Sequence, residues 1–199
     1  MAQFSSLLRG GVHVEDPPIA KFLFNSSVAA WLWLVVRVYL GYQWLDAGLH
    51  KVGEPAWAFG GGSAILGYWQ RAVAIPAPPA RPLITYDWFR AFLQWLIDIQ
   101  AQTWFGGLIA WGEVLVGVGL IVGALVGIAA FFGALMNMNF MLAGTTSSNP
   151  VLFLLAVGLM LAWKNAGLIG LDRLLLPMLG TPWPSQEQAA ALRSATIHA

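Results

Sequence analysis

The chain contains no cysteine and carries little charge. Only 10% of its 199 residues are Asp, Glu, Lys or Arg, whereas an ordinary soluble domain has about 25%. The lack of cysteine excludes disulfides, thiolate nucleophiles and cysteine-ligated iron–sulfur clusters within this chain. A net charge of +1 lacks the basic excess that nucleic-acid binding requires. With 58% hydrophobic residues, the composition predicts an integral membrane protein whose main partner is the lipid bilayer.

Four long apolar stretches predict four membrane-spanning helices. A transmembrane helix needs roughly 20 mostly apolar residues. The stretches that meet this requirement run over residues 28–49, 104–123, 125–144 and 150–171. Short links join the last three stretches, so the expected fold is an all-α, up-down bundle of four transmembrane helices.

The long connection between the first two spans, residues 51–103, is rich in glycine, proline and tryptophan. Two pieces of it, 63–73 and 87–99, have helical character. The second piece has a broad apolar face and is too short to span, so it is expected to lie in the interface or to cap the bundle. A loop of this length in a compact fold indicates a function.

The expected organisation is an N-terminal segment (1–27), a membrane domain (28–171) and a C-terminal tail (172–199). Both termini lie on one side of a four-span bundle, and that side has a slight excess of positive residues near the span ends. By the positive-inside rule, the termini are predicted to be cytoplasmic and the loop 51–103 extracytoplasmic, in the cell membrane.

Charged side chains inside the predicted spans are the first candidates for function. Arg37 lies near the middle of the first span, and Glu113 is the only charge in the second. Because a buried charge is costly unless it is paired, a buried Arg37–Glu113 ion pair is expected between these helices. Two interpretations of the pair stay open: a structural contact that sets helix register, or a part in ligand or proton chemistry.

Deep aromatic and amide side chains form a second group. Most of the 11 tryptophans lie near span ends or in the long loop, as an aromatic belt does, but Trp44 and Trp111 lie deeper. A deep indole either packs in the core, the favoured interpretation, or stacks on a flat ring such as a quinone. Asn137 and Asn139 are two residues apart and lie on nearly opposite helix faces. One is expected to join helices and the other to face a site.

The histidines and glycines do not indicate a metal, haem or nucleotide site. Only His50 of the 3 histidines lies near a predicted span, and its partner at ligand spacing is Asp46. One histidine and one carboxylate make a poor metal site. Gly117 and Gly119 imitate the start of a dinucleotide fingerprint, but they follow no strand.

Four motifs follow one another in a characteristic order. They are the segments 37–51 (Arg37 to Lys51), 112–120 (beginning Gly-Glu), 137–144 (beginning Asn-Met-Asn) and 166–173 (ending Asp-Arg). In order and spacing they resemble the DoxX/DoxD family of four-helix membrane proteins, over residues 25–180. The resemblance implies a membrane subunit of a thiosulfate:quinone oxidoreductase that works with a second subunit.

The positions that match the family's polar signature are Arg37, Lys51, Glu113 and Asn137 or Asn139. The hypothesis of a quinone-linked oxidoreductase assigns roles to these and to the other candidate residues. The catalytic candidates are Glu113, Arg37 and Asp46. The candidates for binding a quinone are Trp44, Asn137, Asn139 and Trp111. The candidates for binding thiosulfate or a similar small anion are Lys51, His50 and Arg90.

A non-catalytic, accessory subunit of a larger membrane complex is the alternative. The lack of cysteine, the scarcity of histidine and the structural interpretation of the charge pair all favour it. Both hypotheses require another protein subunit as partner. A transporter is less favoured, because the chain shows no internal repeat.

Overall fold

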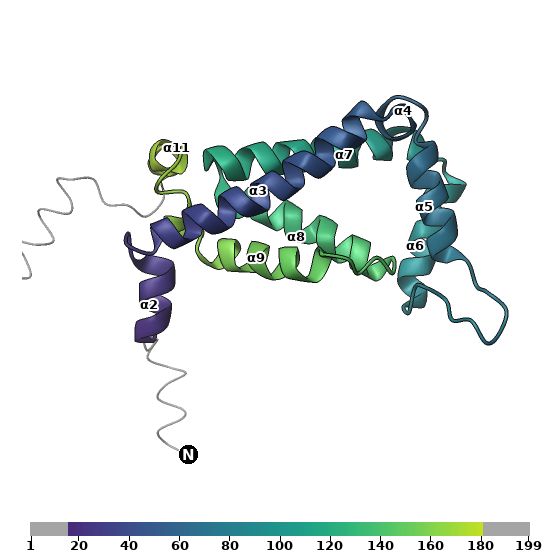
Figure 1. Ribbon diagram of the computed structural model, residues 1–199, viewed down its shortest axis with the longest axis horizontal. Helices are drawn as coiled ribbons and strands as arrows, with labels where there is room; N and C mark the ends of the chain where they lie inside the picture. The colour runs from purple at the N-terminus through teal and green to yellow at the C-terminus, as the bar shows by residue number, and fades with distance from the viewer. Residues whose placement is uncertain (1–15, 181–199) are drawn as a thin grey trace, which may run out of the picture.

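The computed structural model describes residues 16–180, which are helical throughout apart from turns and links (Figure 1). The prediction of an all-helical fold is confirmed for this part of the chain. The helices are α2 (Pro18–Asn25), α3 (Ala30–Gly53), α4 (Pro55–Ala58), α5 (Ser63–Val73), α6 (Asp87–Asp98), α7 (Gln102–Val122), α8 (Val126–Leu142), α9 (Asn149–Leu161), α10 (Trp163–Ala166) and α11 (Asp172–Met178).

The predicted spans agree with the helices except at the fourth. The first three correspond to α3, α7 and α8, and the two loop pieces correspond to α5 and α6. The fourth stretch, expected as one helix over 150–171, is interrupted because α9 ends at Leu161 and the short α10 follows it. The Asn165 amide donates to the carbonyl oxygens of Leu23 (3.0 Å) and Ser26 (2.8 Å), which ties α10 to the end of α2.

Helix length supports fewer spans than predicted. Among the described residues, α7 is long and apolar enough to cross a membrane, and α2 with α3, bent by 60° at their junction, qualifies as a second candidate. α8 and α9 are apolar but shorter. The four-span bundle is therefore not confirmed, and one or two candidate spans are what the structure supports.

The long helices form two arms that meet at the α7–α8 turn (Figure 1). In one arm α3 packs along α7, and in the other α8 packs along α9. Glycines allow the close approach of α3 to α7: a Cβ added at Gly41 would stand 2.9 Å from the carbonyl oxygen of Gly117. Small residues at a helix interface allow backbones to approach this closely.

α5 and α6 stand across the end of the bundle that is remote from the α7–α8 turn (Figure 1). They cap the bundle, which is one of the two alternatives that the sequence left open. Their own hydrophobic core is Ile65, Trp69, Ala72, Ile84, Phe89, Leu93, Leu96, Ala101 and Ala143.

Candidate functional site

Arg37 closes the C-terminal end of α7. Its guanidinium is 1% exposed, and Nη1 donates to the carbonyl oxygens of Leu120 (2.6 Å) and Ile121 (2.7 Å). Nη2 donates to the carbonyl oxygen of Ile169. The last carbonyls of a helix have no partner within the helix and carry partial negative charge, so a cation is stabilising there.

The Asp172 carboxylate binds backbone N–H groups at the N-terminal end of α8. Its Oδ1 accepts from the backbone N–H of Leu125 (2.5 Å), and its Oδ2 accepts from that of Val126 (2.9 Å). Burial raises the pKa of the Asp172 carboxyl, while the two N–H bonds and the charge of Arg37 oppose that rise. Arg37 and Asp172 thus hold the α7–α8 turn from both sides.

Sequence reasoning missed the role of Asp172, which it placed as the first residue of the C-terminal tail. The side chain is buried, and its backbone N–H donates to the carbonyl oxygen of Gly123 at 2.7 Å. The available signal was its position, as the first carboxylate after the fourth apolar stretch.

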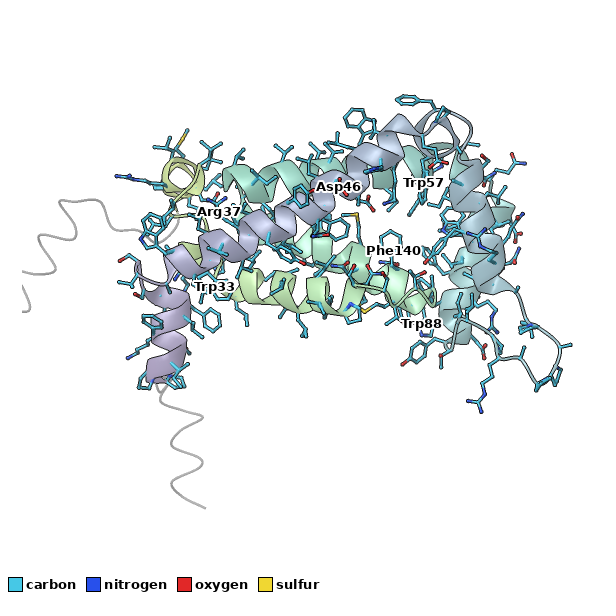
Figure 2. All side chains as sticks on the ribbon, in the orientation of Figure 1. Trp33, Arg37, Asp46, Trp57, Trp88 and Phe140 are labelled. Carbon is cyan, nitrogen blue, oxygen red and sulfur yellow. The ribbon has the colours of Figure 1, made fainter. Side chains whose placement is uncertain are left out.

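The expected Arg37–Glu113 ion pair is wrong. The partner of Glu113 is Lys51, with Nζ 2.6 Å from Oε2. α3 and α7 run antiparallel, and a Cβ at Gly48 would stand 3.0 Å from the Cβ of Glu113. Arg37 precedes Gly48 by eleven residues, or roughly 16 Å along the helix axis. Figure 2 shows Arg37 near α11, far from the α4 end of α3.

The Lys51–Glu113 pair is mostly shielded from solvent. The side chain of Glu113 is 1% exposed and that of Lys51 is 20% exposed. The Lys51 ammonium also stands 5.4 Å from the centroid of the Trp57 ring, within range of a cation–π contact. The cation expected to receive an anionic substrate therefore already has a carboxylate and an indole as partners.

The remaining candidates for anion binding or catalysis also have local partners. His50 and Asp46 are exposed on α3, and His50 Nδ1 lies 2.8 Å from the carbonyl oxygen of Asp46. Arg90 donates to the Asp87 carboxylate (3.1 Å) and to the carbonyl oxygen of Ile84 (2.6 Å), which secures the start of α6. Lys51 is thus paired with Glu113 where α3 packs on α7, and Arg90 bonds to α6 and to the segment before it.

The quinone-binding candidates separate into three environments. Trp44 is buried, and a Cβ at Gly133 would stand 3.0 Å from its Nε1, so it packs between α3 and α8. Trp111 is 49% exposed on α7. Asn137 is fully buried, and within the described residues neither its amide atoms nor Trp44 Nε1 has a hydrogen-bond partner.

Asn139 lines the α7–α8 cleft described below, a cavity whose lining does not include Trp44, Trp111 or Asn137. Its Nδ2 donates to the carbonyl oxygen of Leu135 at 2.8 Å. Asn137 and Asn139 lie in different surroundings, as their spacing predicts, but the hydrogen bond between helices expected of one of them is not seen in the described residues.

The cavity lies between α7 and α8 and is closed at one end by α5 and α6. Its volume is about 650 Å³. None of the described residues that line it is charged. Its lining is Trp57, Ile65, Tyr68, Trp69, Phe89, Phe92, Leu93, Leu96, Phe105, Leu108, Ile109, Gly112, Leu115, Val116, Gly119, Ala124, Leu125, Ile128, Ala129, Phe132, Leu135, Met136, Asn139, Phe140 and Ala143.

Tyr68 places a hydroxyl at the capped end of this cavity. Its Oη lies 2.9 Å from the Thr145 Oγ1. Burial raises the pKa of the Tyr68 hydroxyl, and the Thr145 hydrogen bond and the charge of Arg71 oppose the rise only in part. At neutral pH the hydroxyl is therefore protonated and can donate a hydrogen bond. Trp57 and Phe140 lie at this end of the molecule, beside α4, α5 and α6 (Figure 2).

Sequence reasoning did not find this cavity. The only charge in α7, Glu113, directed attention to the face of the helix that carries it. The cavity lies on another face of α7, which carries Gly112 and Gly119, seven residues apart. The available signal was two glycines at helical spacing within an apolar stretch. The same sequence pattern occurs where a neighbouring helix packs and where a cavity lies, so it does not distinguish the two.

The fold and the cavity together define a class: a helical protein with an uncharged, mostly apolar site of ligand size. Comparisons with family models, with curated proteins and with solved structures find no match to this chain. The resemblance to the DoxX/DoxD family thus depends on the sequence motifs alone. Among the described residues, no three His, Asp or Glu side chains gather as metal ligands do.

Proposed function

We propose that the chain is a DoxX/DoxD-like integral membrane protein, the membrane subunit of a quinone-linked oxidoreductase that uses thiosulfate or a similar small donor. The observation that carries this proposal is the uncharged cavity of about 650 Å³ between α7, α8 and the α5–α6 cap. Organic ligands and cofactors occupy sites of about 300–1,000 Å³ that are mostly apolar with a few polar groups.

The exposure of the long helices supports membrane insertion. The most apolar window of α7 is only 39% buried, whereas the core helix of a soluble protein is mostly buried. Large apolar side chains of α7, α8 and α9 also face outward, as lipid contact requires. Those that do not line the cavity are Trp104, Trp111, Val118, Val122, Phe131, Met138, Val151, Leu154 and Leu161.

Four spans are compatible with the helix lengths if the bilayer adapts. α8 has 17 residues, hence a length of roughly 26 Å, against a hydrocarbon core of roughly 30 Å. A short span is accommodated by thinning of the bilayer at modest cost. We assign α3, α7, α8 and the α9–α10 pair as spans, with cytoplasmic termini and the α4–α6 segment on the opposite side.

The cavity walls suit a quinone in shape and polarity. Trp69 and Phe105 stand edge to face with ring centroids 5.3 Å apart, and both line the capped end. Flat rings pack well against such aromatic walls, and the Tyr68 hydroxyl, bonded to Thr145, is a polar group at that end. A bound quinone would accept two electrons from the donor and two protons from water. Lys51 lies over Trp57, itself a lining residue, so the Lys51–Glu113 pair adjoins the cavity.

Quinone content after purification tests this function. The full chain is purified from membranes in a mild detergent, extracted with solvent and analysed for quinone by mass spectrometry. Membranes that contain the protein are assayed in parallel for thiosulfate-dependent reduction of an added quinone. We expect bound quinone and donor-dependent reduction that exceeds the rate of membranes lacking the protein.

The accessory-subunit function is the second candidate. Its supporting observation is that Arg37 and Asp172, both buried, bond to the backbone at the α7–α8 turn and so act on structure. A folded protein that holds no quinone but purifies with other subunits at fixed stoichiometry would favour this candidate over the oxidoreductase.

A further inference from the structure

The cavity has two chemically different ends. Under the α5–α6 cap its walls are enclosed: Trp69 is 3% exposed and Phe89 is 2% exposed. Along the cleft between α7 and α8 its walls are open, since Leu115 is 69% exposed and Ile128 is 54% exposed. The enclosed end is rich in aromatic rings, and the open side is mainly aliphatic.

The polar groups of the cavity are few and gather at the capped end. Tyr68 Oη contacts Thr145, and it lies 3.5 Å from the carbonyl oxygen of Phe140. The Asn139 side chain belongs to the same end of α8. No described lining residue could neutralise an ionised headgroup, and an unpaired charge in such surroundings is strongly disfavoured.

We propose that this cavity receives an uncharged, ring-bearing amphiphile sideways from the bilayer, through the opening between α7 and α8. The ring occupies the aromatic end under the cap, beside Tyr68, and the aliphatic tail lies in the open groove along Leu115 and Ile128. The identification of the ligand as a quinone rests on the proposed function above. The entry route, the orientation and the preference for an uncharged headgroup rest on the cavity itself.

Gly112 offers a way to fill the cavity without disturbing the bundle. A Cβ added there has Met136 Sδ as its nearest neighbour, at 3.9 Å, so a larger side chain extends into the cavity. Replacing a glycine inside a helix also removes a penalty of about 1 kcal/mol. Gly112→Leu is therefore expected to fold while it blocks the site.

Gly67 provides the matched control. It lies within α5 but is not among the lining residues, and a Cβ there would meet only the flexible end of Arg71, 3.7 Å away. Gly67→Leu makes the same chemical change in a helix of the cap and leaves the cavity open.

The experiment measures binding of two quinones to the purified chain in nanodiscs. One probe carries a ten-carbon tail, and the other has the same ring with a methyl group in its place. Affinities are compared at equal concentrations of the two probes within the bilayer, because a ten-carbon tail dissolves in lipid whether or not the protein has a groove. On that scale we expect the wild type to bind the tailed probe at least about threefold more tightly, because the walls of the groove pack against its tail. Gly112→Leu should lose at least about tenfold in affinity for the tailed probe, while Gly67→Leu should match the wild type.

Each other result overturns a definite part of the proposal. Equal affinity of the wild type for both probes would refute the tail groove without needing any variant. Tight quinone binding that Gly112→Leu leaves unchanged would refute the cavity as the site, while the proposed function would stand. A wild type that binds no quinone, but binds a fatty acid or phospholipid in a manner sensitive to Gly112→Leu, would refute both the uncharged headgroup and the quinone-linked function.

Discussion

The two ends of the bundle differ in the polarity of their buried side chains. At the α7–α8 turn, the buried charges of Arg37 and Asp172 bond directly to backbone groups. At the α5–α6 end, the cavity has no charged described residue in its walls. Arg37, the first candidate in the sequence, therefore acts with Asp172 to hold the turn, and the cavity lies among residues without charge.

Physical chemistry accounts for this contrast. Buried charges are tolerated when several hydrogen bonds satisfy them, and helix ends offer such bonds because their terminal N–H and C=O groups lack partners. An apolar ligand, in contrast, is held by an apolar protein surface that fits its shape, because removing apolar surface from water is favourable.

Removal of the Arg37 charge should produce the largest effect. Arg37→Met leaves the α7 carbonyls and Asp172 without their cation, and loss of one partner from a buried charged network costs about 3–5 kcal/mol. Thermal unfolding in detergent, followed by circular dichroism, measures the loss against Arg90→Met, whose hydrogen bonds lie nearer the surface. Wild-type stability combined with lost quinone binding would instead give Arg37 a part in ligand chemistry.

The Lys51–Glu113 pair should come next. Lys51→Met leaves a buried carboxylate without its cation, so we expect a loss of about 2–3 kcal/mol in the free energy of unfolding. The double variant Lys51→Met with Glu113→Gln should recover part of this loss, because no unpaired charge remains. A double-mutant cycle on unfolding, with quinone content recorded for each variant, separates a structural pair from a functional one. Additive losses would mean that the two side chains do not interact.

Gly123 tests the geometry of the turn more gently. Its φ is +71°, and an added Cβ would stand 2.8 Å from the Arg37 guanidinium carbon. Gly123→Ala should cost about 1–2 kcal/mol, because the left-handed conformation is strained for alanine and Arg37 is held by its carbonyl partners. Gly53, where an added Cβ meets nothing within 4 Å, is the control position. If both alanine variants unfold at the same temperature, the turn has room for a Cβ at position 123, and the close approach of Arg37 to Gly123 is contradicted.

Tyr68 should show the smallest effect on stability. Tyr68→Phe removes one hydroxyl hydrogen bond, worth about 1 kcal/mol. The pKa of Tyr68 is raised in the folded protein. The contribution of its protonated hydroxyl to the free energy of unfolding is therefore complete below the usual pKa of 10.0, and it is lost as the pH rises through the pKa of the folded protein. Ultraviolet difference titration of wild type against the variant should therefore show a tyrosine that ionises above pH 10.0. Ionisation below that pH would contradict the buried placement of the hydroxyl.

Helix positions could largely be predicted from the sequence, because apolar runs, Gly-Pro breaks and helical spacing are local properties. The loop helix predicted over 63–73 coincides with α5 (Ser63–Val73). The fourth stretch is divided into α9 and α10, and Asn165 of α10 bonds to carbonyls near α2, more than a hundred residues away in sequence. No local pattern contains such a contact.

The candidate site could be predicted only in part. Asn139 was named and does line the cavity, but Trp44 and Trp111 do not. Glu113 was expected to be paired, and it is paired, but with Lys51. A slide of one antiparallel helix by a few turns exchanges one cation for the other, and a single sequence does not specify that slide.

By itself, the sequence determined that the described chain is helical and highly apolar, and where most of its helices lie. These properties follow from composition and from spacing along one helix. Only the tertiary structure decided that Lys51 meets Glu113, that Arg37 and Asp172 hold the α7–α8 turn, and that a cavity opens beside Gly112. These features depend on the register and separation of helices, which are set by side chains brought together from distant parts of the chain.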